Sequence, residues 1–258
     1  MDQVFAVIGK ANPRIEAEEK VTGEFQFVGD LPVFRDTLYC KILRSPLAHA
    51  LVRHLDASKA RRLPGVKAVV SHQETQEQFV TRGISAHPRK PRPWDSCILE
   101  KEVRYVGDRV AAVAATHPEI AEEALRLIEV DYETLPAVFD PGEAIRFGAP
   151  RVHKYNYTAE EAIPIENNIV APVNLAFGDV ERGFKEADRI LENEFRTAYQ
   201  FNAPLARPVC LARPLPQGRL EVWNSSQGIH WSRICLAASL GLPLSKIRVH
   251  RISLGGAF

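Results

Sequence analysis

Residues 109–133 constrain the fold most, because a strand, a helix and a second strand follow one another within this stretch. Arg109–Ala115 is almost entirely apolar, which is typical of a buried strand. Thr116–Glu119 has the spacing of a capping box, with Pro118 in the first turn of the expected helix. Glu129–Glu133 then alternates like a half-buried strand, so the stretch predicts a compact α+β unit. The apolar residues of the helix share one face, and they are Ile120, Ala124, Leu127 and Ile128.

The rest of the chain divides into two regions joined by a linker. The first region, residues 13–140, is expected to add strands at Thr37–Leu43, Leu51–Leu55 and Val66–Val70 and a short helix at Asp56–Leu63. Residues 141–172 have weak periodicity, which indicates a linker. The second region, residues 173–258, predicts helices at Asp179–Ala187 and Gly228–Leu240 and strands at Arg189–Tyr199, Val209–Arg213, Arg219–Trp223 and Ile247–Ile252. The helix Gly228–Leu240 is mostly apolar and should be largely buried, with Gly241 as its cap.

Composition and charge exclude several classes of protein. The chain has 258 residues, of which 45% are hydrophobic and 25% are charged, so it is expected to bury a core without disulfide bonds. Lys and Arg number 33 against 32 Asp and Glu, and this balance gives no indication of a nucleic acid or an anionic membrane as partner. No apolar run approaches the ~18 residues needed to span a bilayer.

Cysteine usage bears on metal sites and on the compartment. Cys40, Cys97, Cys210 and Cys235 show no CxxC spacing, which argues against a zinc or iron–sulfur site within this chain. Together with the absence of a signal sequence, this usage predicts a reducing compartment, the cytoplasm.

One short segment is a candidate site on its residues alone. Ser225–Gly228 lies between an expected strand and the apolar helix. Two interpretations stay open, since the segment either caps the helix or aims Gln227 and helix N–H groups at an anion or a metal-bound oxygen. His49 and His54 lack ligand spacing and are interpreted as surface or core residues. Three cations stand between prolines in an expected exposed loop at residues 87–93, namely Arg89, Lys90 and Arg92.

The sequence closes on a strand followed by Gly255, Gly256, Ala257 and Phe258. Glycines after a strand permit close approach of the backbone to a ligand or another element. Either the chain finishes at a sheet edge, or the rest of the domain lies on another polypeptide.

Several segments together resemble the large subunit of the molybdenum hydroxylases, the xanthine dehydrogenase and aldehyde oxidase family, over about residues 13–258. Those that resemble its a/b hammerhead domain are Val21–Gly23, Gly29–Leu31, Leu43–Ala50, Leu63–Val66, Glu102–Ala114 and Glu129–Ala137. Those that resemble the first part of its molybdenum-binding region are Gly178–Glu181, Trp223–Gly228, Leu240–Pro243 and Gly255–Phe258. The expected fold class is therefore α+β, with a hammerhead domain followed by an incomplete α/β molybdopterin-binding domain.

The resemblance implies a molybdenum ion held by a pyranopterin dithiolene cofactor, and hydroxylation of an aldehyde or an N-heterocycle with oxygen from water. Electrons would leave through iron–sulfur clusters to a flavin or another acceptor, and these groups are expected on partner subunits. By position, Gln227 resembles the glutamine that hydrogen-bonds a molybdenum oxygen, with Gly228 beside it. Gly256, Ala257 and Phe258 resemble the loop that passes beside the metal and pterin. No side chain of this chain is expected to ligate the metal.

Two departures from the family limit what is assigned. The family's glutamate general base and most of its cofactor contacts lie beyond the matched part, so we assign no catalytic residue. Where the family commonly has Pro-Leu-Glu-Pro, residues 204–208 read Pro-Leu-Ala-Arg-Pro, which replaces the acidic residue and adds a cation.

We predict a subunit or N-terminal portion of a molybdenum-dependent hydroxylase. It should be active only with the remaining molybdenum-binding polypeptide, an iron–sulfur subunit, and a flavin subunit or another electron acceptor. The alternatives are a non-catalytic scaffold or remnant that assembles with the catalytic chain, and a fragment of a longer chain.

Overall fold

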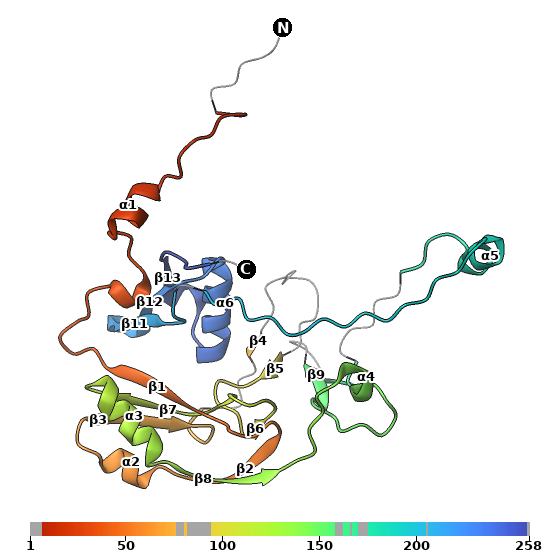
Figure 1. Ribbon diagram of the computed structural model, residues 1–258. Coiled ribbons are helices and arrows are strands. Elements are labelled where there is room, and N and C mark those ends of the chain that lie inside the picture. Colours follow the sequence, from red (N-terminus) through yellow and green to blue (C-terminus); the bar gives the residue numbers. More distant parts are fainter. Residues whose placement is uncertain are drawn as a thin grey trace. The chain divides into compact units, whose positions relative to one another are not determined.

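The computed structural model describes residues 7–75, 80–81, 94–157, 162–165, 167–169, 175–204 and 206–256. It divides the chain into two compact units (Figure 1). The central unit comprises residues 36–202, and the terminal unit joins residues 1–35 to residues 203–258. Both units mix helices and strands, which confirms the expected α+β class.

These units differ from the predicted domain boundaries, because the segment before residue 36 groups with the C-terminal part. The division at residues 13–140, 141–172 and 173–258 therefore stays a prediction. The cationic loop expected at residues 87–93, Ala257 and Phe258 lie outside the described residues.

Two three-stranded antiparallel sheets form the body of the central unit, with strand orders β1-β7-β3 and β6-β2-β8. Their strands are β1 (Tyr39–Arg44), β2 (Ala50–Asp56), β3 (Val66–Ser71), β6 (Glu102–Val103), β7 (Arg109–Ala115) and β8 (Glu129–Thr134). Helix α2 (Ser58–Arg62) contacts β3, and α3 (Pro118–Arg126) packs on β1 and β7. The predicted strand–helix–strand stretch is thus confirmed as β7, α3 and β8.

The core of the central unit forms around β7, whose small apolar side chains let neighbouring elements pack closely. Val110, Ala111, Val113 and Ala115 are buried there. Helix α3 and the residues after it supply one apolar face to this core, as its periodicity predicts. The buried residues of that face are Ala121, Ala124 and Ile128.

Helix α3 does not begin with the predicted capping box. Its N-cap is His117, which makes no side-chain capping hydrogen bond, and Pro118 occupies the first turn as expected. The Thr116 amide instead donates to the carbonyl of Gly65 at 3.0 Å. This bond ties Thr116 to the turn before β3, so the helix starts only after it.

The predicted linker contains short elements of its own. They are α4 (Pro141–Ala144), β9 (Tyr155–Tyr157) and β10 (Ala162–Pro164), and the last two pair antiparallel. Two further short strands, β4 (Val80–Thr81) and β5 (Trp94–Ser96), also pair with each other.

Helix α5 (Val180–Glu186) confirms the helix expected at residues 179–187. Asp179 caps it by accepting a hydrogen bond from the Arg182 amide at 3.0 Å. The strand predicted at Arg189–Tyr199 is wrong, because this stretch pairs with no strand in the described part of the chain and all its residues are exposed. Alternation of apolar and polar residues predicts a strand when a neighbouring element buries the apolar side chains. The described residues contain no such neighbour for this stretch.

The terminal unit is built on one sheet of order β11-β12-β13. Its elements are α1 (Ala17–Thr22), η1 (Val28–Asp30), β11 (Cys210–Leu215), η2 (Pro216–Gly218), β12 (Arg219–Asn224), α6 (Ile229–Leu240), η3 (Leu244–Lys246) and β13 (Ile247–Arg251). Strand β11 is antiparallel to β12, and β13 is parallel to it, so α6 is the crossover helix of a β-α-β unit.

Helix α6 ends as predicted but is less buried than predicted. Gly241 closes it in the left-handed conformation at φ 63°. No residue of α6 is fully buried, because the helix packs against a single three-stranded sheet. Among the described residues, no helix is both long and apolar enough to cross a bilayer.

Two buried carboxylates flank the start of β7. Asp108 is 1% exposed and accepts hydrogen bonds from the amides of Arg104 (3.1 Å) and Arg109 (3.0 Å). Glu100 is 3% exposed and accepts from the Cys97 amide at 2.8 Å. Its oxygens lie 3.5 Å from the guanidinium of Arg104 and 3.8 Å from that of Arg109. Burial is the largest influence on Glu100 and raises its pKa.

Replacing Glu100 by glutamine is expected to make the free energy of unfolding decrease less as the pH rises. A carboxyl whose pKa is higher in the folded than in the unfolded protein holds its proton more tightly when folded. Its contribution is full below the unfolded pKa, near 4.5, and is lost as the pH rises through the folded pKa. The free energy of unfolding, measured by urea denaturation between pH 4 and pH 8, should therefore decline less steeply for Glu100→Gln. Glu123→Gln, on the exposed side of α3, is the control and should follow the parent; identical profiles for all three proteins would contradict the prediction.

Candidate functional site

The parallel pair β12 and β13 brings two predicted site segments to the same edge of one sheet. Asn224 and Arg251 are partners in the register, so the carboxyl ends of the two strands lie side by side. Gln227 follows the end of β12, and Gly255 and Gly256 follow the end of β13. In open sheets with parallel strands, ligands bind beyond the carboxyl ends of the strands. The fold thus gathers residues that are distant in sequence at an edge suited to binding.

The turn from β12 into α6 is held by serines. The Ser226 hydroxyl accepts a hydrogen bond from the Gly228 amide at 3.2 Å and lies 3.0 Å from the Ser232 hydroxyl. The Asn224 side-chain amide donates to Ser232 at 3.4 Å. Gly228 is the N-cap of α6, and Gln227 is exposed. Ser226 thus holds the turn that leads into α6 but does not cap the helix, since the N-cap Gly228 has no side-chain capping bond. Gln227 and the first turn of α6 follow the carboxyl end of β12.

The glycine loop after β13 lies against the segment in which the sequence departs from the family pattern. A Cβ built on Gly255 would lie 2.7 Å from the Cβ and 2.9 Å from the Cα of Ala206, closer than real Cβ atoms approach. Glycine at this position is therefore required by the contact. Arg207, next to Ala206, is exposed. The structure joins these two segments, a contact that sequence reasoning did not find.

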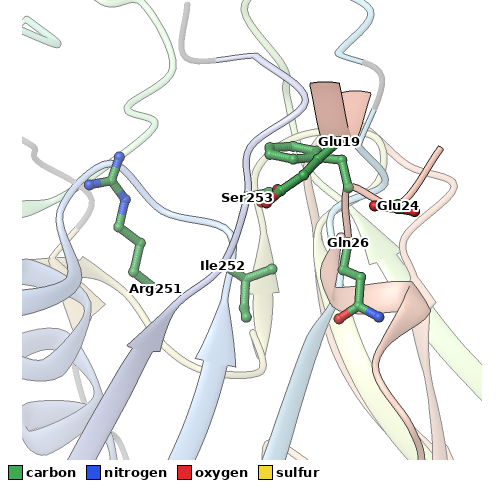
Figure 2. Close-up of a pocket in the computed structure, with 7 residues that line it drawn as sticks. Glu19, Glu24, Gln26, Arg251, Ile252 and Ser253 are labelled. Atoms are coloured by element: carbon green, nitrogen blue, oxygen red, sulfur yellow. The ribbon is translucent and has the colours of Figure 1, made fainter. Parts of the chain in front are cut away.

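A hollow of about 430 Å³ lies beside the end of β13. Its lining residues come from α1, from the segment after α1 and from the end of β13: Glu19, Glu24, Phe25, Gln26, Arg251, Ile252 and Ser253. Figure 2 shows Glu19, Glu24 and Gln26 on one side of the segment Arg251–Ser253, while the Arg251 side chain extends to the other side. The sequence placed residues 251–253 at the end of a strand, but no local signal linked residues 19–26 to that end.

The predicted histidines do not form a ligand pair. His49 has its Nδ1 2.6 Å from the carbonyl of Pro136 and its Nε2 3.2 Å from Glu102, while His54 is exposed on β2. Across the described residues, no three His, Cys, Asp or Glu side chains come together in a way that could hold a metal ion. The groups that can contact a cofactor at the β12–β13 edge are thus an amide, backbone N–H donors and glycine backbone.

Two family models match the chain. Residues 22–136 match the a/b hammerhead domain of aldehyde oxidase and xanthine dehydrogenase, and residues 163–258 match the molybdopterin cofactor-binding domain. The chain belongs to the xanthine dehydrogenase and aldehyde oxidase family of molybdenum hydroxylases. The sequence resemblance and the expected fold, a hammerhead domain with part of a molybdenum-binding domain, are confirmed.

The molybdenum hydroxylases to which the chain is similar are longer proteins. It is 35% identical, over an alignment of 278 residues, to the probable hypoxanthine oxidase XdhD of Escherichia coli K12, which covers 98% of this chain and 29% of that protein. It is 32% identical to the nicotinate dehydrogenase large molybdopterin subunit of Eubacterium barkeri, covering 100% of this chain and 56% of that subunit. The quinoline 2-oxidoreductase of Pseudomonas putida 86 matches the structure with a TM-score of 0.81 and 27% identity, covering 97% of this chain and 31% of that one. The chain therefore spans from under a third to just over half of the length of these relatives.

Proposed function

We propose that this chain supplies one wall of the molybdenum–pterin site of a hydroxylase that oxidises an aldehyde or an N-heterocycle with oxygen derived from water. The observation that carries the proposal is the shared carboxyl edge of β12 and β13, because Gln227 follows one of these strands and the glycine loop follows the other. This edge lies within residues 163–258, which match a molybdopterin cofactor-binding domain. The hypoxanthine, nicotinate and quinoline named for the relatives are N-heterocycles and favour that substrate class.

The residues at this edge fit such a cofactor. The contact between Gly255 and Ala206 shows that the loop backbone takes a path that a side chain would block, and such a path lets backbone approach a flat ring closely. The first turn of α6 offers N–H donors, to which oxygens of an anionic cofactor bind favourably. When bound, the cofactor would supply the redox chemistry. The chain's own part is to bind and orient it, through the Gln227 amide, the Gly228 backbone and the loop of Gly256, Ala257 and Phe258.

The remaining parts of the site would come from the polypeptide that carries the rest of the molybdenum-binding domain, including the general base. An iron–sulfur subunit and a flavin subunit would carry the electrons away. Two observations support an assembly of this kind. The relatives that share this region differ in length, and one of them is named as subunit gamma of a dehydrogenase complex. The cytoplasm stays the predicted compartment.

The test is co-expression of this chain with the polypeptide that carries the rest of the domain, followed by metal and pterin analysis of the purified complex. We expect molybdenum and pterin to co-purify with the complex. A stable complex free of both, from cells that load another molybdenum hydroxylase, would overturn the proposal.

A non-catalytic scaffold is the second candidate, and one observation favours it. Ala206 and Arg207 replace the acidic residue that the family commonly has, and Ala206 lies directly against the glycine loop. A scaffold of this kind would assemble with the catalytic chain without contributing to turnover. A Gln227→Ala substitution separates the two candidates, because a scaffold would keep the turnover of the complex unchanged.

A further inference from the structure

The segment Leu191–Phe201 combines a strand-like sequence with the absence of any strand partner among the described residues. In an extended chain alternate residues lie on opposite faces, and the large apolar residues of this segment all fall on one face, together with Asn193 and Thr197. The large apolar residues of one face are Leu191, Phe195, Tyr199 and Phe201. The polar residues of the other face are Glu192, Glu194, Arg196 and Gln200.

An ion pair joins two residues of the polar face, and the apolar side chains of the other face are exposed. Arg196 pairs with Glu194 at 2.8 Å, a contact between alternate residues on the polar face. Leu191, Phe195 and Tyr199 on the apolar face are 88%, 87% and 98% exposed. Figure 1 draws the segment as coil. It is thus an extended segment whose apolar row and backbone hydrogen-bonding groups are both open to solvent.

An exposed row of this kind indicates an interaction surface. Soluble proteins cover large contiguous apolar patches, and an extended segment with free backbone groups is a template for pairing with another strand. Addition of a strand to a sheet edge satisfies the backbone groups and buries alternate side chains, which is the pattern this segment carries.

The comparisons point to one occupant. The segment lies inside residues 163–258, the part that matches a cofactor-binding domain, and the chain covers only 29% and 56% of two relatives that contain this part. We propose that Leu191–Phe201 adds as a β-strand to a sheet edge of the polypeptide that carries the rest of the molybdenum-binding domain. This inference rests on the proposed function and names the surface through which that assembly forms.

Hydrogen–deuterium exchange on the full chain, alone and in the co-expressed complex, tests the pairing directly. Amides of residues 191–201 should exchange at least about tenfold more slowly in the complex, because strand addition protects backbone N–H groups. Protection in a complex that lacks molybdenum would support the inference while contradicting the proposed function. A molybdenum-bearing complex in which these amides exchange as fast as in the free chain would overturn the inference alone.

A matched pair of variants tests the apolar face. The double variant Phe195→Gln and Tyr199→Gln should weaken binding of the partner polypeptide by about 10- to 100-fold, since buried aromatic side chains dominate interface affinity. The control, Glu194→Gln and Arg196→Gln, introduces the same residue on the opposite face and should change the Kd less than about threefold. Equal effects from the two pairs would overturn the proposed face. Concentration-dependent dimerisation of the chain alone, lost in the first pair only, would identify a second copy as the occupant and overturn the proposal.

Discussion

Gln227→Ala is expected to lower kcat about 10²-fold in a complex that has retained its molybdenum, the size of effect found when one preorganised hydrogen-bond donor is removed from an active site. The side chain is exposed and follows β12 at the proposed cofactor edge, so its removal should leave the fold intact. The serine bonds that hold the turn belong to Ser226 and Ser232 and are kept in the variant. The measurement is kcat from steady-state kinetics with an N-heterocyclic substrate, together with the molybdenum content of the complex.

The control for this variant is Gln73→Ala, the same change at an exposed position of the central unit. It should leave kcat and molybdenum content unchanged. Unchanged turnover for Gln227→Ala as well, in a fully loaded complex, would contradict the cofactor role and favour the scaffold. A loss of molybdenum with unchanged turnover per metal ion would show that Gln227 retains the cofactor and takes no part in the reaction.

Asp108→Ala is expected to destabilise the chain by about 3 kcal/mol, because two partly buried amides lose their acceptor. The carboxylate is 1% exposed and accepts from the backbone of Arg104 and Arg109. The Asp108 backbone also accepts from the Ser45 amide at 2.8 Å, which ties β7 to the end of β1. Urea denaturation followed by circular dichroism gives the free energy of unfolding.

Two further variants make the Asp108 result specific. Asp108→Asn retains a side-chain oxygen that accepts from an amide and should cost less than the alanine change. Asp131→Ala, at an exposed position of β8, should stay within about 0.5 kcal/mol of the parent. An Asp108→Ala protein as stable as Asp131→Ala would contradict the role assigned to the buried carboxylate.

Local pattern predicted the elements whose apolar residues are buried within their own unit. The apolar run of β7 and the one-sided face of α3 were read correctly, because each element packs against its neighbours within one unit. The strand expected at Arg189–Tyr199 was wrong because its apolar residues find no neighbouring strand among the described residues. The burial of α6 failed in the same way, because apolar composition states what a helix can bury and not how much surface is present to cover it.

Some features of the candidate site could likewise be predicted from local sequence, and others could not. Gln227 and the glycine loop were proposed from sequence motifs. They lie at the same edge of the sheet because β12 and β13, joined through a helix, pair in parallel. The contact of Gly255 with Ala206 and the hollow lined by Glu19 and Ser253 join distant parts of the chain. No local periodicity reports such contacts, because they depend on how the sheet is assembled.

The terminal unit is made of residues 1–35 and residues 203–258, and this division governs the order in which the molecule can form. During translation, residues 1–35 must wait until residues 203–258 have been synthesised before the sheet of the terminal unit exists. The central unit, which is continuous in sequence, can fold meanwhile. Residues that line the hollow beside β13 therefore come together only after the central unit has been synthesised, and a nascent chain would expose residues 19–26 to chaperones during that time.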